Sequence, residues 1–213
     1  MSELTINVAA KFFRSSMDSD IPYAFPWILA AGQPFYDWFC GGRDVAERTV
    51  AMWMKQPSSE VSIQRVQIFQ SGSDIAGGII GLGGTELKKA RMADTGTFYA
   101  TLDVRSRGAL IERLSQSAQA FAPVADDEYY VSKMGIAQSF RGKGLGKALV
   151  EHHLDQGNAL GYTKFRADVH TENEPSLRSF LAVGFEIFYT GQTADGALKY
   201  HALRYERKSK DIR

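Results

Sequence analysis

The chain has 213 residues, of which 44% are apolar and 23% charged, and its formal net charge is +1. This length suits a single domain over residues 1–213 with a sizeable core, and the near-neutral charge argues against a protein that coats nucleic acid or a membrane. No apolar stretch approaches the roughly 18 residues that a membrane span needs. The first residues lack the pattern of a signal peptide, so we expect a cytoplasmic protein.

The first part of the chain predicts a strand, an aromatic-rich region and a helix. Leu4–Val8 alternates apolar and polar residues, as in a short strand. An aromatic-rich region over Pro22–Trp53 follows, and an amphipathic helix is expected over 46–54 with Asp44 as its N-cap. Cys40 is the only cysteine and has no histidine beside it in the sequence, so we expect a buried and unreactive thiol.

Two further alternating stretches, Val61–Phe69 and Ile75–Leu82, predict a β-hairpin, because turn-forming residues join them. The apolar residues of Gly83–Gly108 follow no firm period, so we interpret this segment as a connection. Ala109–Phe121, by contrast, has one apolar helical face. The segment 83–125 is therefore expected to be an insertion between strands.

The second half alternates strands and helices more regularly. The expected order is strand, helix, strand, helix, strand and strand, at Glu128–Ala137, Leu145–Leu160, Lys164–Val169, Pro175–Val183, Phe185–Thr190 and Leu198–Tyr205. The strand–helix–strand unit predicts two neighbouring parallel strands, whereas the front half predicts antiparallel ones. The fold class is therefore α/β, a mixed sheet with helices on its faces.

The most informative segment is the turn Arg141–Lys147, which contains three glycines and three cations. Glycines let successive backbone N–H groups point into one concavity, because no Cβ blocks the approach. The helix that follows adds its unpaired N–H groups and the positive end of its dipole. The segment therefore predicts a site for phosphate or pyrophosphate.

Two common phosphate-binding motifs do not fit this turn. A P-loop needs four residues between its glycines and a hydroxyl after its lysine, but Gly142 and Gly146 are closer than that and Ala148 follows the lysine. A dinucleotide-binding unit has the spacing G-x-G-x-x-G, whereas the spacing here is G-x-G-x-G. ATPase and dinucleotide-binding functions are therefore disfavoured.

The segment Arg141–Gly146 resembles the Gln/Arg-x-x-Gly-x-Gly/Ala signature of the GNAT N-acetyltransferase superfamily, in which this turn binds the pyrophosphate of acetyl-CoA. Downstream, Asn173–Phe185 is similar to the family's Asn-x-x-Ala-x-x-Leu-Tyr-x-Lys-x-Gly-Phe segment, at the expected separation. The resemblance implies the acyl-CoA N-acyltransferase (GNAT) fold, with an antiparallel front half and two splayed parallel strands. It also implies acetyl transfer from acetyl-CoA to a primary amine by direct attack in a ternary complex.

The resemblance assigns roles in the donor site. It implies that the pyrophosphate is held at Arg141, Gly142, Lys143, Gly144, Leu145, Gly146 and Lys147, and the pantetheine arm at Met134, Gly135, Ile136 and Asn173. The two lysines are explained equally well as solvated surface residues. The backbone N–H of Ile136 is expected to stabilise the thioester oxyanion. The resemblance also places Phe180 in the acetyl-CoA site. Phe180 occupies the position of a tyrosine that often protonates the departing thiolate, and its ring has no proton to donate.

A proton acceptor is also needed, because an attacking alkyl amine, with a pKa of roughly 10, must be neutral. Glu128, Tyr130 and Ser132 share one side of their strand. Family members often place a glutamate there, so the resemblance implies Glu128 as the general base, directly or through water. A surface acid at the start of the strand is the alternative interpretation.

The acceptor stays open between a small-molecule amine and a peptide amine. The resemblance places its pocket among Pro22–Phe39, Gly83–Ala125 and Leu198–Tyr205. No metal site is expected, because His152 and His153 are adjacent rather than one helical turn apart. The alternative function is a CoA-binding sensor or interaction domain that has lost catalysis, which the missing tyrosine favours. A homodimer is compatible with either function.

Overall fold

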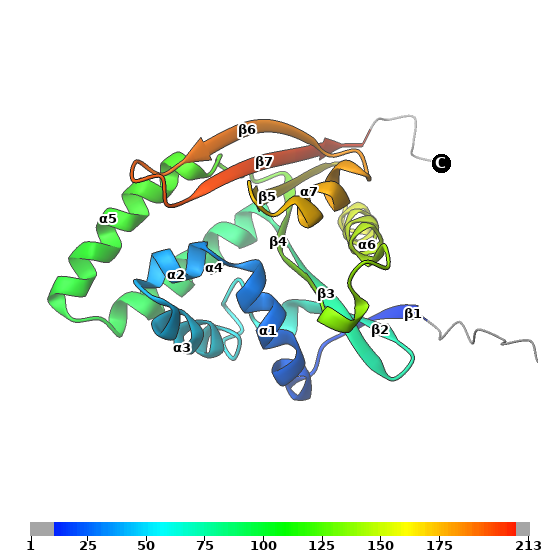
Figure 1. Ribbon diagram of the computed structural model, residues 1–213, viewed down its shortest axis with the longest axis horizontal. Helices are drawn as coiled ribbons and strands as arrows, with labels where there is room; N and C mark the ends of the chain where they lie inside the picture. The colour runs from blue at the N-terminus through cyan, green and yellow to red at the C-terminus, as the bar shows by residue number, and fades with distance from the viewer. Residues whose placement is uncertain (1–10, 208–213) are drawn as a thin grey trace, which may run out of the picture.

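The computed structural model of the protein describes residues 11–207, in which seven strands form one sheet (Figure 1). The strand order is β1-β2-β3-β4-β5-β7-β6. The bounds are β1 Lys11–Ser15, β2 Val66–Ser71, β3 Asp74–Gly83, β4 Glu128–Ile136, β5 Lys164–His170, β6 Glu186–Gln192 and β7 Lys199–Glu206. β4 and β5 are parallel, and the other described neighbours are antiparallel. The mixed sheet is therefore as predicted, whereas the strand expected at Leu4–Val8 lies outside the described residues.

Helices cover both faces of the sheet (Figure 1). One face carries α1 Ile21–Ala31, α2 Phe35–Cys40, α3 Arg43–Trp53 and α4 Gly84–Ala100, and the other carries α6 Leu145–Ala159 and α7 Glu174–Leu181. α5 Val104–Ala120 packs against β6 at the sheet edge. Strand residues alternate between the faces, so Ile80 and Leu82 of β3 join the core under α1–α4 and Ile79 joins the core under α6.

The predicted hairpin is confirmed as β2 and β3, with Gly72 of the connecting loop in the left-handed region at φ 62°. β2 begins later than expected, because Ile63–Arg65 forms a short 3-10 helix that buries Ile63. α3 begins at Arg43, so Asp44 lies within the helix instead of capping it. No helix within residues 11–207 is long and apolar enough to cross a membrane.

The expectation of an irregular connection over Gly83–Gly108 is wrong, because α4 occupies most of this segment. Its buried side chains Leu87, Ala90, Asp94 and Phe98 recur at helical spacing. One of them is small and one is charged, so the apolar period is weak. The helix packs against β3 and β4, and this tertiary contact stabilises it more than its own sequence pattern does. Together α4 and α5 fill the segment 83–125 between two strands.

Candidate active site

The two parallel strands separate near the centre of the sheet. β4 and β5 pair only from Glu128, opposite Lys164, to Val131, opposite Ala167. The rest of β4 pairs with β3 alone, which leaves one edge of its backbone unpaired toward β5. Such an edge gives a ligand access to main-chain hydrogen-bonding groups. The splay that the resemblance implied is therefore present.

The glycine-rich turn follows β4 and borders this opening. Gly142 and Gly144 both have a φ of 74°, a left-handed conformation that glycine adopts without strain, and α6 begins at the next residue, Leu145. A Cβ added at Gly142 or Gly144 would meet no atom within 4 Å, so both glycines border open space. Arg141 ties the turn to β4, because its Nε donates a 3.2 Å hydrogen bond to the carbonyl oxygen of Ile136.

A groove of about 780 Å³ runs between the separated strands, the glycine turn and α7, and we call it the donor groove. It is lined by all but one of the residues predicted to bind acetyl-CoA: Met134, Gly135, Ile136, Arg141, Gly142, Gly144, Leu145, Gly146, Lys147, Asn173 and Phe180. The exception is Lys143, whose Nζ lies 4.9 Å from the centroid of the Phe140 ring. The structure thus gathers these predicted residues into one groove.

The end of the donor groove at α7 is polar at one residue and apolar at another. Asn173 caps the helix, because its Oδ1 accepts a 3.2 Å hydrogen bond from the N–H of Ser176. Phe180 is buried, and its ring meets Phe185 edge-on with the centroids 5.1 Å apart. Phe180 therefore adds only a carbon surface to the groove. Tyr200 of β7 also lines the groove, and burial raises the pKa of its hydroxyl above the ordinary range.

The predicted base, Glu128, lies at the opposite end of β4 from Ile136. Its Oε2 accepts a 2.7 Å hydrogen bond from the Ala125 N–H and a 3.3 Å one from Arg166 Nη1. Within residues 11–207, Glu128 lines neither the donor groove nor the cavity described next. Its neighbours on the same side of the strand, Tyr130 and Ser132, do line that cavity.

A second cavity, of about 250 Å³, adjoins the donor groove, and we call it the acceptor cavity. Its lining combines charged side chains with an aromatic set, which consists of Phe35, Tyr36, Phe39, Trp53, Phe121, Tyr130 and Tyr200. The cavity and the groove have five lining residues in common, Ala31, Ser132, Lys133, Asp168 and Tyr200. These residues mark the junction between the two spaces.

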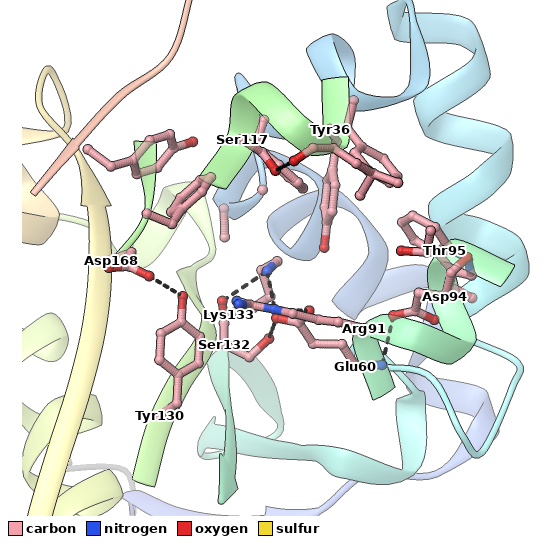
Figure 2. A pocket seen from close by; sticks show the side chains of 18 of the residues that line it. Tyr36, Glu60, Arg91, Asp94, Thr95, Ser117, Tyr130, Ser132, Lys133 and Asp168 are labelled. Carbon is pink, nitrogen blue, oxygen red and sulfur yellow. Dashed lines mark hydrogen bonds and ion pairs between the residues drawn. The ribbon is translucent and has the colours of Figure 1, made fainter. Parts of the chain in front are cut away.

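A cluster of ion pairs lies in the acceptor cavity (Figure 2). Glu60 accepts a 3.1 Å hydrogen bond from Arg91 Nε of α4 and a 2.7 Å one from Ser132 Oγ. Lys133 Nζ lies 3.5 Å from the same carboxylate. Burial opposes ionisation of Glu60, but the charges of Arg91 and Lys133 outweigh it, so its pKa is lowered to about 2. Glu60 is therefore ionised at neutral pH and shared by two cations.

A β-bulge explains why Ser132 and Lys133 both reach this cavity. The register between β3 and β4 shifts, so that Ile80 lies opposite Lys133 and Gly81 opposite Val131, with Ser132 between them. Regular alternation would send neighbouring side chains to opposite faces, whereas a bulge re-aims them. Strand periodicity therefore predicts Ser132 on the cavity side but misses Lys133.

Asp168 of β5 lies at the junction of the cavity and the groove. The Tyr130 hydroxyl donates a 3.0 Å hydrogen bond to its Oδ2 (Figure 2). Its side chain is only 3% exposed, and burial raises its pKa in spite of nearby guanidinium groups. Sequence reasoning did not single out this residue as part of the site. The available signal was the strand Lys164–His170, in which Arg166 and Asp168 alternate with apolar residues of a central strand.

No group of three or more His, Cys, Asp or Glu side chains within residues 11–207 is arranged to hold a metal ion. The histidine pair of α6 serves packing instead. His153 is fully buried against the ring of Tyr129, with centroids 4.5 Å apart, and burial lowers its pKa to about 3. His152 stacks on Phe13 at 3.5 Å.

Comparisons with known proteins agree with this geometry. Residues 87–185 match the model of the Acetyltransferase (GNAT) family. A comparison with curated proteins finds no match. Among solved structures, an N-acetyltransferase from Staphylococcus aureus Mu50 has a TM-score of 0.66 at 18% identity, covering 91% of this chain and 100% of that chain. The ribosomal-protein-S18-alanine N-acetyltransferase from Escherichia coli has a TM-score of 0.53 at 15% identity, covering 96% of this chain and 99% of that chain.

An agmatine N-acetyltransferase mutant in its apo form has a TM-score of 0.57 at 14% identity, covering 92% of this chain and 99% of that chain. At these identities the likeness concerns the fold. The segment matched by the family model contains β4, the glycine turn, β5 and α7, which build the donor groove. The chain therefore has the acyl-CoA N-acyltransferase fold, and its residues 87–185 match the Acetyltransferase (GNAT) family, as the resemblance of the glycine turn predicted.

Proposed function

We propose that the protein transfers the acetyl group of acetyl-CoA to the primary amine of a small molecule bound in the acceptor cavity. The observation that carries this proposal is the junction of the two spaces at Ser132, Lys133, Asp168 and Tyr200. A thioester in the donor groove and an amine in the acceptor cavity meet there. Direct attack in a ternary complex needs this juxtaposition of the two reactants.

The donor groove has the groups that a CoA thioester requires. The free N–H groups at the start of α6, with Arg141 and Lys147, suit a pyrophosphate. The N–H of Ala137 donates to the carbonyl oxygen of Ala76 in β3. Because successive N–H groups of a strand point to opposite edges, the N–H of Ile136 points to the open edge of β4. We assign to this N–H the stabilisation of the thioester oxyanion.

The acceptor cavity favours a small amine with an apolar body over a peptide. Its volume of about 250 Å³ and its aromatic walls suit a compact ligand, because such rings bind apolar groups through buried contact area. A peptide acceptor would need a longer open groove that also binds its backbone. We therefore favour the small-molecule alternative of the two acceptors that the sequence left open.

A covalent intermediate on the enzyme is not supported. Cys40 is buried, and burial raises its pKa to about 11, whereas the reactive form of cysteine is the thiolate. Phe180 cannot protonate the departing CoA thiolate, so we assign that proton to water. The same phenylalanine favours the second candidate function, a domain that binds CoA without catalysing transfer.

Release of free CoA thiol distinguishes the two functions. With acetyl-CoA as donor, we expect thiol release that depends on apolar primary amines, and a product that carries one acetyl group by mass spectrometry. The matching tertiary amines serve as controls, because they have no N–H to lose when an amide forms. Tight CoA binding in calorimetry, with no thiol release for any amine or lysine peptide, would support the non-catalytic function and reject the enzyme.

A further inference from the structure

One carboxyl group lines both the donor groove and the acceptor cavity. Within residues 11–207, Asp168 is the only acidic residue that lines both spaces. It lies on β5, just past the point where β5 stops pairing with β4. Figure 2 shows it at one side of the acceptor cavity, with the cluster of Glu60, Arg91 and Lys133 beside it. Asp168 is therefore close to the place where amine and thioester would meet.

The two oxygens of this carboxyl group differ in their contacts. Oδ2 accepts the hydrogen bond from Tyr130, whereas Oδ1 is buried and accepts no hydrogen bond from the described chain. Nη2 of Arg166 forms an ion pair with Oδ1 at 3.8 Å, which is too long for a hydrogen bond. A buried carboxylate oxygen without a donor costs free energy, and an N–H group of a ligand would relieve that cost. The structure therefore has an acceptor atom that lacks its donor at the junction.

The other acidic residues nearby are already engaged. Glu60 binds both Arg91 and Lys133. Asp94 accepts a 2.9 Å hydrogen bond from the backbone N–H of Glu60 and lines only the acceptor cavity. Glu128, the base predicted from the sequence, is bound by Arg166 and lines neither space in the described chain.

Five charged or titratable side chains face Asp168: Arg91 of α4, Tyr130 and Lys133 of β4, Arg166 of β5 and Tyr200 of β7. Arg91 and Lys133 share the carboxylate of Glu60, whereas Arg166 forms ion pairs with both Glu128 and Asp168. The ion pair of Asp168 is too long for a hydrogen bond, so its Oδ1 can still accept one from an amine. Burial raises the pKa of Asp168, and the same surroundings lower the pKa of an amine. A raised carboxyl pKa makes the Asp168 carboxylate a stronger proton acceptor than an ordinary aspartate.

We propose that Asp168 is the catalytic base of the acetyl transfer, an inference that rests on the proposed function. Its Oδ1 accepts a hydrogen bond from the attacking amine. The nitrogen lone pair forms the N–C bond, the π electrons of the thioester carbonyl move to its oxygen, and the proton on nitrogen passes to Oδ1. The carbonyl then re-forms as the C–S bond breaks. The thiolate takes a proton from water, and Asp168 returns its proton to the hydroxide.

The test compares Asp168→Asn and Glu128→Gln in the full-length protein, because each change keeps the size of its side chain. Asp168→Asn is expected to lower kcat/KM for the amine by about 100-fold or more without changing the affinity for CoA in calorimetry. It should also remove the part of the pH profile in which the rate rises as an enzyme carboxyl ionises. Glu128→Gln should keep that rise. A normal pH profile in Asp168→Asn, or loss of the rise in Glu128→Gln, would overturn the assignment.

A second measurement needs no variant. A primary amine that is fluorinated beside its amino carbon has a much lower ammonium pKa than an alkyl amine, so its own titration moves to lower pH. With this acceptor, the wild-type rate should still rise with pH as Asp168 ionises, and a flat profile would overturn the proposal. Wild-type protein that releases no CoA with any amine would reject the proposed function itself. Active wild-type protein with a fully active Asp168→Asn variant would reject only the role of Asp168.

Discussion

Gly144→Val is expected to weaken acetyl-CoA binding by on the order of 100-fold, which corresponds to about 3 kcal/mol. Gly144 has a φ of 74° immediately before α6, and an L-residue there costs about 1–2 kcal/mol or distorts the turn. The valine side chain would also enter the open space that the turn borders, where we propose that the pyrophosphate binds. Calorimetry with CoA measures the loss.

Gly161→Val is the matched control for this change. Gly161 follows the C-terminal end of the same helix, has a φ of 88°, and also has no atom within 4 Å of an added Cβ. Both variants carry the same kind of backbone strain, so thermal denaturation should show a similar destabilisation. Only Gly144→Val should lose affinity for CoA. Equal CoA affinities in the two variants would exclude the glycine turn as the pyrophosphate site.

Glu60→Gln should lower the free energy of unfolding by about 3 kcal/mol, because it leaves Lys133 and the partly buried Arg91 without their counter-ion. The side chains of Glu60 and Lys133 are each 11% exposed. Arg91 is 42% exposed, so solvent relieves part of the cost and we expect the low end of the usual range. Glutamine keeps the size of the side chain and an oxygen for the Ser132 hydroxyl. Urea denaturation therefore reports mainly the lost charge.

The difference in unfolding free energy between wild type and Glu60→Gln should depend on pH. The pKa of Glu60 is lowered from 4.5 to about 2 on folding. A carboxyl of this kind stabilises the native state fully above its unfolded pKa, and the contribution disappears as the pH falls through its folded pKa. The gap between wild type and Glu60→Gln should therefore be constant above pH 4.5 and close as the pH approaches 2.

Glu47→Gln provides the comparison for Glu60→Gln, because it removes one charge from an exposed pair with Arg43. Such an exposed pair on a helix surface contributes little to stability, because solvent screens the two charges. If Glu60→Gln costs no more than Glu47→Gln at neutral pH, the buried cluster does not depend on the Glu60 charge.

The second half of the fold was predictable because its signals are local. β4, α6, β5 and α7 each have their own periodicity, and the turn Arg141–Lys147 combines glycine spacing with charge. α4 was missed because Ala90 and Asp94 interrupt the apolar residues of its inner face. Packing against β3 and β4 stabilises this helix, and a window of sequence contains no information about that packing.

The donor groove could be predicted from the sequence, whereas the acceptor cavity could not, for the same reason. Residues of the donor groove come largely from two short segments, Met134–Lys147 and Asn173–Phe180, so a motif captures them. The acceptor cavity instead assembles Glu60, Arg91 and Asp168 from a loop, a helix and a strand. No spacing rule links residues so far apart in the chain. Their role follows from burial and pairing, which only the three-dimensional structure provides.

Ser117→Trp decides whether the amine enters through the acceptor cavity. Ser117 of α5 lines this cavity and not the donor groove, and an indole ring would fill much of its space of about 250 Å³. Ser115→Trp is the matched control, because Ser115 is exposed on the same helix and lines neither space in the described chain.

The measurement is kcat/KM for amine-dependent CoA release by the two variants, with CoA affinity determined in parallel. We predict that Ser117→Trp loses on the order of 100-fold in kcat/KM with unchanged CoA affinity, and that Ser115→Trp matches wild type. Equal kcat/KM values for Ser117→Trp and wild type would show that the acceptor amine binds elsewhere.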